Sequence, residues 1–335
     1  MSRYMSLIGQ NARKASLDKI NSKTKNKILK RYAFLLGQEK QSILKANQKD
    51  IQFAFGKGLK SNLIERLTID EKKLIGIKNS IDKIANLKDP VDTTLEKWRR
   101  PNGLTISRVS IPIGVIGVIY ESRPNVTSDV ASLCFKSGNA VILKGGSEAI
   151  NTNKILAKLF RKSLKENKVN ENFIQFIDSK DRKMVDFMLS KMKDYIDVII
   201  PRGGKGLVDL VQREARVPVF AHLEGIVHIY VDASADPQKT FDVVINAKTR
   251  RPGICGAAEC LLLHKEVGAS WGPDLISALI SEGVTVHADS TLHNIAGTKP
   301  AKDQHWGHEF LDMEIAAKTV SGIDDAIAHI QIYGS

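Results

Sequence analysis

The chain has 335 residues, of which 42% are hydrophobic and 26% are charged, and its formal net charge at pH 7 is +13. These values are typical of a globular protein long enough for two domains, and they exclude a disordered or fibrous chain. No apolar run approaches the roughly 18 residues of a membrane span, and the N-terminus has no signal-peptide core, so we expect no membrane association. The three cysteines lack the spacing of a disulfide framework, which favours a reduced, cytoplasmic setting; they are Cys134, Cys255 and Cys260.

The excess of positive charge has three interpretations: a nucleic-acid surface, a surface for small anionic ligands, or a merely lysine-rich composition. The lysines are scattered through amphipathic segments such as residues 23–32, and no aromatic stacking motif of an RNA-binding domain accompanies them. Nucleic-acid binding, which would depend steeply on salt concentration, is therefore the weaker interpretation. We expect no nucleic-acid partner.

The first predicted elements are helices, which extend to about Leu87. Apolar residues recur at spacings of three and four between Leu63 and Ile81, as on one face of an amphipathic helix. Asp89-Pro90 ends this helical region. Residues 104–111 then alternate apolar and polar over much of their length, which predicts a strand with one face in water.

Short apolar runs alternate with helical stretches through the rest of the chain. Continuous apolar strands separated by helices predict parallel sheets covered on both faces, which makes doubly wound α/β the expected fold class. The predicted strands are residues 115–120, 140–143, 173–177, 198–200, 228–231, 261–263 and 284–286.

The first of these strands runs into a polar turn that contains Arg123 and Asn125. Because the ligand crevice of an open α/β sheet lies at the carboxyl ends of its strands, both side chains are candidates for a binding site. The Asn125 amide could donate a hydrogen bond to a developing oxyanion. Thr127 or Ser128 is predicted to cap the helix that follows. The alternative is that this segment is only a polar turn, and the segment alone slightly favours it.

Two further strand ends combine basic residues with glycines. In Lys144-Gly145-Gly146-Ser147 the lysine can reach a ribose or phosphate, and the glycines let a ligand approach the backbone near a helix N-terminus. Pro201-Arg202-Gly203-Gly204 could hold a phosphate in the same way. Each turn alone is weak evidence, because tight strand-to-helix connections use glycines too and the chain has no G-x-G-x-x-G fingerprint. Their recurrence favours an anionic cofactor.

Cys255 is the candidate nucleophile. It lies among glycines and alanines just before a predicted strand, and Lys248, Arg250 and Arg251 precede it. Nearby positive charge lowers the pKa of a thiol and favours the nucleophilic thiolate, and small neighbours leave room for a substrate at the sulfur. The alternative, a small buried hydrophobe, suits the other two cysteines better.

A group of histidines near the C-terminus could suggest a metal. Their spacing matches no common zinc pattern and no cysteine is nearby, so we expect no metal site. The histidines are His287, His293, His305 and His308.

Taken together and in this order, residues 111–149, 223–232 and 246–259 resemble the γ-glutamyl phosphate reductases of the aldehyde dehydrogenase superfamily. The resemblance implies two doubly wound α/β domains and a β-strand oligomerisation arm. The NADPH-binding domain would consist of residues 1–95 and 112–232, the arm strand of residues 96–111, and the catalytic domain of residues 233–335.

The resemblance also implies a reaction and its residues. Cys255 would attack L-glutamyl 5-phosphate, expel phosphate and form a thioester, which NADPH would reduce to L-glutamate 5-semialdehyde in proline biosynthesis. Asn125 and the backbone N–H of Cys255 would stabilise the oxyanion. Arg123 and Arg251 would bind the substrate. The cofactor residues would be Lys144, Gly145, Gly146, Ser147, Gly203, Gly204 and Glu224.

The resemblance further implies a homo-oligomer and a functional association with glutamate 5-kinase. Members of the family continue past Ser335, and the additional segment supplies catalytic-domain strands, a glutamate near the nicotinamide ribose and the partner of the arm. We therefore expect the catalytic domain to be incomplete and the activity of this chain to be weak or absent. The alternatives are a non-catalytic relative that acts by association and another acyl or aldehyde dehydrogenase of the superfamily.

Overall fold

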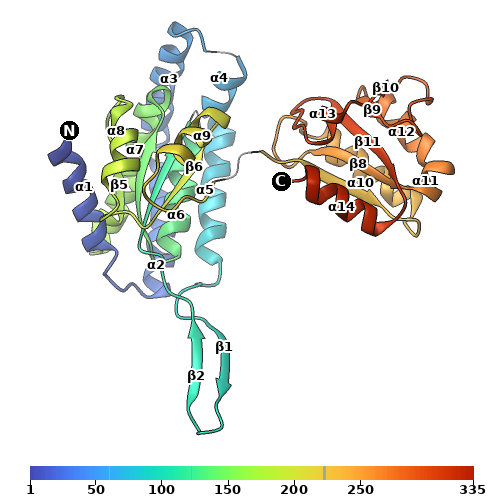
Figure 1. The fold of residues 1–335 in the computed structure, drawn as a ribbon. Helices are drawn as coiled ribbons and strands as arrows, with labels where there is room; N and C mark the ends of the chain where they lie inside the picture. Colours follow the sequence, from blue (N-terminus) through green and yellow to red (C-terminus); the bar gives the residue numbers. More distant parts are fainter. Residues whose placement is uncertain (60, 122, 222–223) are drawn as a thin grey trace. The chain divides into compact units, whose positions relative to one another are not determined.

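The computed structural model describes residues 1–59, 61–121, 123–221 and 224–335. The chain forms two compact units, Met1–Ala221 and His222–Ser335, each built on its own parallel sheet (Figure 1). Among the residues described, each helix is too short or too polar to cross a membrane.

The first unit begins with five helices, as the spacing of its apolar residues predicts. Side chains cap two of them: Asn21 accepts a hydrogen bond from the backbone N–H of Thr24, and Asp70 accepts one from that of Lys73. The helices are α1 (Ser2–Ala15), α2 (Ser22–Gln38), α3 (Lys40–Gly56), α4 (Ser61–Leu67) and α5 (Glu71–Asn86).

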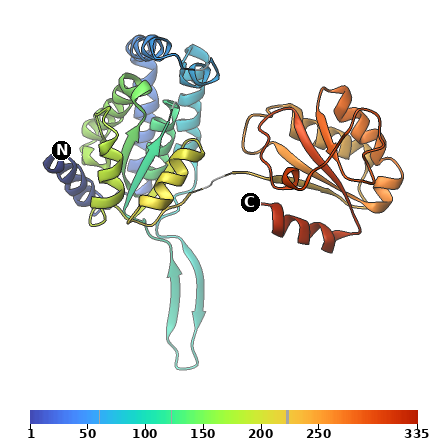
Figure 2. The same ribbon diagram turned by 45° about the horizontal axis from the view of Figure 1, so that its top comes forward.

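A two-stranded antiparallel hairpin follows, made of β1 (Thr94–Arg99) and β2 (Thr105–Val109). Both strands are exposed over almost their whole length, and the hairpin extends away from the rest of its unit (Figure 2). The strand predicted from the alternation at residues 104–111 is confirmed. The single arm strand expected over residues 96–111 is instead a hairpin that begins at Thr94. Its first strand was missed because it is mostly polar and is held by hydrogen bonds to β2 rather than by a buried face.

A parallel sheet in the order β5-β4-β3-β6 lies at the centre of the first unit. All residues of β3 (Val115–Tyr120) and β4 (Ala140–Gly145) are buried. Because alternate residues of a strand point to opposite faces, both faces of this sheet are covered, which confirms the predicted α/β fold class. The chain places β4 on one side of β3 and β6 on the other, so a topological switch point lies between β3 and β6.

The remaining elements of the first unit alternate between helix and strand. They are α6 (Asn125–Lys136), η1 (Ser147–Ala149), α7 (Ile150–Glu166), η2 (Glu171–Phe173), β5 (Ile174–Phe176), α8 (Lys183–Lys191), β6 (Val198–Arg202) and α9 (Lys205–Glu214).

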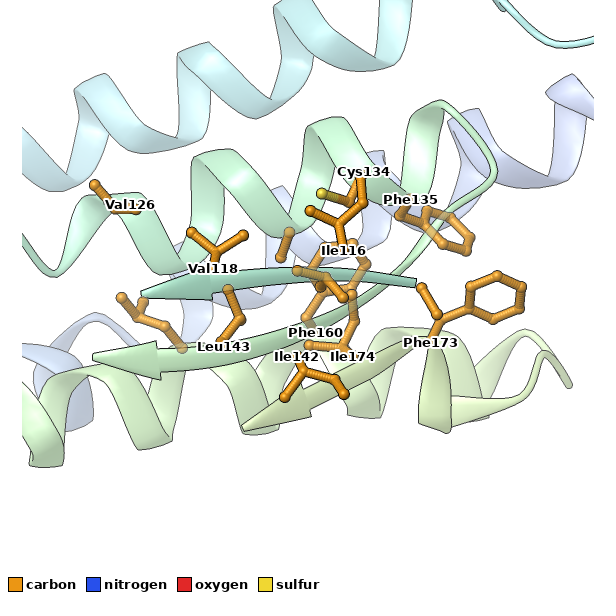
Figure 3. Close-up of a cluster of buried hydrophobic side chains, with 14 of the residues drawn as sticks. Ile116, Val118, Val126, Cys134, Phe135, Ile142, Leu143, Phe160, Phe173 and Ile174 are labelled. Carbon is orange, nitrogen blue, oxygen red and sulfur yellow. The ribbon is translucent and has the colours of Figure 1, made fainter. Parts of the chain in front are cut away.

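Aromatic side chains fill part of the core of the first unit (Figure 3). The ring of Phe135 on α6 packs edge-on against Phe160 and Phe173, with centroids 5.7 and 5.5 Å apart. Cys134, the neighbour of Phe135, is buried in the same cluster, and burial raises the pKa of its thiol to about 12. The structure confirms the prediction that Cys134 is a small buried hydrophobe.

The second unit has a parallel sheet in the order β10-β9-β11-β8-β7. Its middle strand, β11 (Glu314–Val320), was not predicted. Glu314 and Lys318 interrupt its apolar run, and its two alanines have low strand propensity, so position in the sheet outweighs local preference here.

The predicted domain boundary after residue 232 needs correction. Strand β7 (Val227–Val231) pairs with β8 (Ala258–His264) and so belongs to the second unit, which begins at residue 222. An apolar run predicts a buried strand but carries no information about which sheet it joins. The other elements of this unit are α10 (Pro237–Thr249), α11 (Lys265–Ala269), α12 (Gly272–Ser281), β9 (Thr285–Ala288), β10 (Lys299–Pro300), α13 (Asp303–Trp306) and α14 (Ile323–Tyr333).

Candidate active site

Most of the residues predicted to bind the cofactor lie at one edge of the first sheet. Tyr120, the last residue of β3, is in register with Gly145 at the end of β4 and with Arg202 at the end of β6. Parallel strands with aligned ends bring together the turns that follow them, and these turns flank the switch point. We call the strand ends at Tyr120, Lys144-Gly145 and Arg202, with the turns at residues 121, 123–125, 146–149 and 203–204, the carboxyl edge.

Lys144 is buried at the end of β4. Its Nζ donates a hydrogen bond to the carbonyl oxygen of Gly145, 2.7 Å away. Burial lowers the pKa of Lys144, whereas the negative charges of Glu148 and Asp181 raise it. A buried ammonium group whose protein partner is a neutral carbonyl is stabilised further when an anion binds beside it. This property is expected of a residue that binds an anionic cofactor.

Close packing requires glycine at the end of β4. A Cβ atom at Gly145 would collide with the amide of Asn153, and one at Gly146 would collide with the carboxylate of Glu148. Ser147 begins the short helix η1 and is half-buried. The predicted turn therefore has the close backbone packing that its glycines suggested.

Gly203 and Gly204 follow β6 and directly precede α9. The backbone N–H of Gly204 donates a hydrogen bond to Oε2 of Glu121, 3.1 Å away, and Glu121 follows β3. A carboxylate thus lies at the N-terminus of α9, where backbone N–H groups and the helix dipole favour an anion. The turn predicted to hold a phosphate already has an anionic partner from the protein.

Asn125 is the first residue of α6, so the helix begins earlier than predicted. The expected caps, Thr127 and Ser128, are buried inside the helix instead, and the hydroxyl of Thr127 bonds that of Tyr120 at 2.7 Å. The prediction was wrong because hydroxyl residues near a helix start serve equally well as hydrogen-bond partners in a polar core. Arg123 is exposed in the turn before the helix.

The Asn125 amide faces a carboxylate on its own helix. Its Nδ2 donates a hydrogen bond to Oδ2 of Asp129 at 3.0 Å, and burial raises the pKa of Asp129. Both residues line a cavity of about 360 Å³ together with Arg66 and Ser80. One N–H of this amide is therefore already paired within the protein, and the role of Asn125 as an oxyanion donor stays a prediction.

In the second unit, residues 250–257 form the cysteine loop, which joins α10 to β8. Cys255 is exposed in this loop, whereas the other two cysteines are buried, as predicted. In the part of the chain that the structure describes, the backbone N–H of Cys255 has no hydrogen-bond partner. An exposed thiol next to an unpaired N–H is the arrangement that nucleophilic acyl chemistry requires.

Gly225 lies against the cysteine loop. A Cβ atom at this position would collide with the carbonyl oxygen of Cys255, so the motif that contains Gly225 needs glycine for a close backbone approach. The carbonyl oxygen of Glu224 accepts a hydrogen bond from the Ser335 hydroxyl at 2.6 Å. The predicted cofactor contact of Glu224 stays a prediction, and Leu223 of the same motif lies outside the described residues.

A buried ion pair that was not predicted connects the two ends of the cysteine loop. Nζ of Lys248 on α10 lies 2.8 Å from Oε2 of Glu259 in β8, and both side chains are buried. Burial raises the pKa of Glu259, and Lys248 opposes that shift. Lys248 was expected to place positive charge beside the thiol, but its charge is paired with Glu259. The exposed Arg250 and Arg251 are the remaining cations of the loop.

Three of the four C-terminal histidines gather around a cavity of about 370 Å³, lined by His287, His305 and His308. Nε2 of His287 lies 2.8 Å from a carboxylate oxygen of Glu314. The rings of His287 and His305 are 4.1 Å apart between centroids. His293 lies elsewhere, with its Nδ1 bonded to the carbonyl oxygen of Ser290 at 2.8 Å.

The sequence profile of the aldehyde dehydrogenase family matches residues 8–290. The chain belongs to this family. Curated γ-glutamyl phosphate reductases of Parvibaculum lavamentivorans and Clostridium botulinum are 45% and 43% identical to it, over 100% and 98% of this chain and 80% of each relative. The crystal structure of γ-glutamyl phosphate reductase from Thermotoga maritima matches with a TM-score of 0.92 and 39% identity, over 98% of this chain and 80% of that one.

These relatives place the chain among the γ-glutamyl phosphate reductases, oxidoreductases of the aldehyde dehydrogenase family. The resemblance inferred from the sequence motifs and the fold it implies are confirmed. Enzymes of the family act with NAD or NADP as cofactor.

Proposed function

We propose that this chain catalyses the NADPH-dependent reduction of L-glutamyl 5-phosphate to L-glutamate 5-semialdehyde, with release of phosphate, in proline biosynthesis. The names of its relatives support the substrate. The observation that carries the proposal is Cys255, which is exposed in a glycine-rich loop while Cys134 and Cys260 are buried.

The proposed chemistry begins at the Cys255 sulfur. The thiolate attacks the acyl carbon, the carbon–oxygen bond to phosphate breaks, and phosphate leaves with the bonding electron pair to give a thioester. The exposed guanidinium groups of Arg250 and Arg251 carry positive charge that attracts a substrate with phosphate and carboxylate groups.

The tetrahedral intermediate carries a negative oxygen that needs hydrogen-bond donors. The backbone N–H of Cys255, which has no partner among the described residues, is one candidate, and the amide of Asn125 is the second. Arg123, exposed two residues before Asn125, is the proposed substrate ligand of the first unit.

The carboxyl edge fits an anionic dinucleotide, because it combines a buried ammonium group, a helix N-terminus and glycines, of which Gly145, Gly146 and Gly203 have no room for a Cβ. The residues proposed to hold NADPH there are Lys144, Gly145, Gly146, Ser147, Gly203 and Gly204. Glu224 is a further proposed cofactor residue. NADPH, when bound, supplies the hydride that converts the thioester to the aldehyde.

The exposed hairpin of β1 and β2 is the proposed oligomerisation arm. It carries apolar side chains that are exposed to solvent in the single chain, among them Leu95 and Trp98. Association of the chain with glutamate 5-kinase stays a prediction.

The decisive experiment follows NADP⁺ reduction with L-glutamate 5-semialdehyde and phosphate. This is the reverse reaction, chosen because the acyl phosphate is unstable. Any turnover with NADP⁺ should disappear in Cys255→Ala and persist in Cys134→Ala, because only the first substitution removes an exposed thiol.

A folded Cys255→Ala variant that keeps its turnover would exclude the thioester mechanism. A folded wild-type chain that binds NADPH without turnover would instead favour a non-catalytic relative. A preference for NAD⁺ would correct the cofactor and leave the reaction unchanged.

A further inference from the structure

Three potential metal ligands that the proposed reaction does not use meet in the second unit. His228 on β7, Cys260 on β8 and His329 on α14 each offer one ligand atom, and these atoms all lie within 4.8 Å of one another. Cys260 is fully buried, His329 is 3% exposed and His228 is half-buried. The group therefore combines one thiol and two imidazoles at the boundary between the sheet and the C-terminal helix.

The hydrogen bonds of His228 prepare it to bind a metal. Its Nδ1 lies 2.8 Å from the carbonyl oxygen of Ile226, and because a carbonyl only accepts, Nδ1 carries the proton. This fixes the tautomer with a lone pair on Nε2, as in histidines that ligate metals. That Nε2 is buried and has no hydrogen-bond partner among the described residues.

The spacing of the donors matches a tetrahedral ion. Sγ of Cys260 and Nε2 of His329 are 3.7 Å apart. A zinc ion about 2.3 Å from sulfur and about 2.0 Å from nitrogen would separate two tetrahedral donors by about 3.5 Å. A direct thiol–imidazole hydrogen bond also fits this distance, but it leaves Nε2 of His228 unpaired, whereas a shared ion satisfies all three atoms.

We propose that His228, Cys260 and His329 form a three-ligand binding site for a zinc ion. One sulfur and two imidazole nitrogens are ligands that zinc prefers, and the neutral imidazoles need lose no proton. The Cys260 thiol gives its proton to solvent as the ion binds. The ion joins α14 to β7 and β8, so its expected role is to hold the C-terminal helix on the sheet.

Lys318 opposes the ion. Its Nζ lies 3.4 Å from Nδ1 of His329, and because an ammonium group only donates, this contact places the imidazole proton on Nε2 in the ion-free state. Zinc binding at Nε2 must therefore move that proton to Nδ1 and turn Lys318 away. Exchange of a thiol proton for Zn²⁺ adds one positive charge to the site, which the Lys318 ammonium repels and the carboxylate of Asp325 attracts. Lys318→Met is therefore expected to bind zinc several-fold more tightly than the wild type.

The test uses the whole chain in a Cys255→Ser background, so that the exposed thiol of the cysteine loop cannot bind metal. Cobalt(II) is titrated first under a metal-free phosphine reductant, because a thiolate ligand gives a near-ultraviolet charge-transfer band. We expect this band in the background protein, its loss in Cys260→Ala, and at least about 100-fold weaker binding in His329→Gln. Zinc should displace cobalt and raise the melting temperature by a few degrees.

Cys134→Ala, which removes the other buried thiol, is the matched control and should keep the band. The proposal is overturned by a background protein that shows no thiolate band, or by one whose band survives in Cys260→Ala. Circular dichroism of each variant establishes that it is folded. If His329→Gln unfolds, His228→Gln provides the second ligand test.

Discussion

The cysteine loop and the carboxyl edge, the two regions that the proposed reaction needs, are stabilised by different kinds of contact. The loop is joined at its base by a buried ion pair between Lys248 and Glu259. At the edge, uncharged side chains bond one another. The hydroxyl of Tyr120 lies 2.7 Å from that of Thr127, which in turn donates a hydrogen bond to Oδ1 of Asn153 at 2.9 Å. The loop should therefore respond to changes of charge, and the edge to changes of shape.

The largest expected effect comes from breaking the ion pair. Lys248→Met leaves Glu259 buried without its partner, which should cost about 3–5 kcal/mol of the free energy of unfolding. Unfolding in urea can be followed by tryptophan fluorescence in a Trp98→Phe background, where Trp271 and Trp306 report on the second unit alone.

The double variant Lys248→Met, Glu259→Leu is the matched control, since it removes both charges and should recover most of the loss. The single variant should also recover as the pH falls. Without Lys248 the folded-state pKa of Glu259 rises further, so its protonated form stabilises the fold at low pH and this stability is lost as the pH rises through that pKa. A single variant as stable as the wild type at neutral pH would contradict the role given to the pair.

The second prediction concerns the pH dependence of stability, through the protonation of His329 on the C-terminal helix α14. Burial lowers the pKa of His329 to about 4. Since the unfolded chain has the higher value of about 6.5, the stability from neutral His329 is complete above pH 6.5 and is lost between about pH 6.5 and 4, by about 3 kcal/mol. Urea unfolding in EDTA at several pH values measures this slope, which His329→Gln should flatten.

A third prediction concerns shape at the carboxyl edge. Gly145→Ala should lower stability by about 1–3 kcal/mol, because its Cβ would collide with Asn153. Gly204 has open space around its Cα, so Gly204→Ala should keep its stability and lose only NADPH affinity. Thermal unfolding and fluorescence titration with NADPH separate the two effects. Equal NADPH affinity in Gly204→Ala and the wild type would remove Gly204 from the proposed site.

The sequence predicted the positions of the central strands of the first unit well for a physical reason. The buried parts of β3, β4 and β6 appear as continuous apolar runs, and the predicted end of β3 is correct. β4 and β6 each continue two residues past the predicted end, because buried Lys144 and the Pro201-Arg202 pair still belong to the strands. The candidate residues at the carboxyl edge followed from those ends.

Features that depend on distant partners were not predictable in this way. β11 lies in the middle of its sheet although its own residues favour a strand weakly, and β7 joined the second sheet rather than the first. Lys248 looked like a cation beside the thiol because its partner, Glu259, lies eleven positions away, beyond the loop. Spacing along the chain shows which charges are near one another, but not which are neutralised.

The smallest expected effect tests whether charge matters at the carboxyl edge too. Glu121 accepts a hydrogen bond from the N–H of Gly204 at the start of α9, where the proposal places a cofactor phosphate. Its carboxylate would repel that phosphate, so Glu121→Gln should bind NADPH about two- to three-fold more tightly, a change of about 0.5 kcal/mol that shrinks at high salt. Fluorescence titrations with NADPH at low and high salt measure it, with Glu148→Gln as a comparison on the neighbouring turn. Weaker binding in Glu121→Gln would mean that this carboxylate orders the turn for the cofactor, and the edge would then depend on charge as the cysteine loop does.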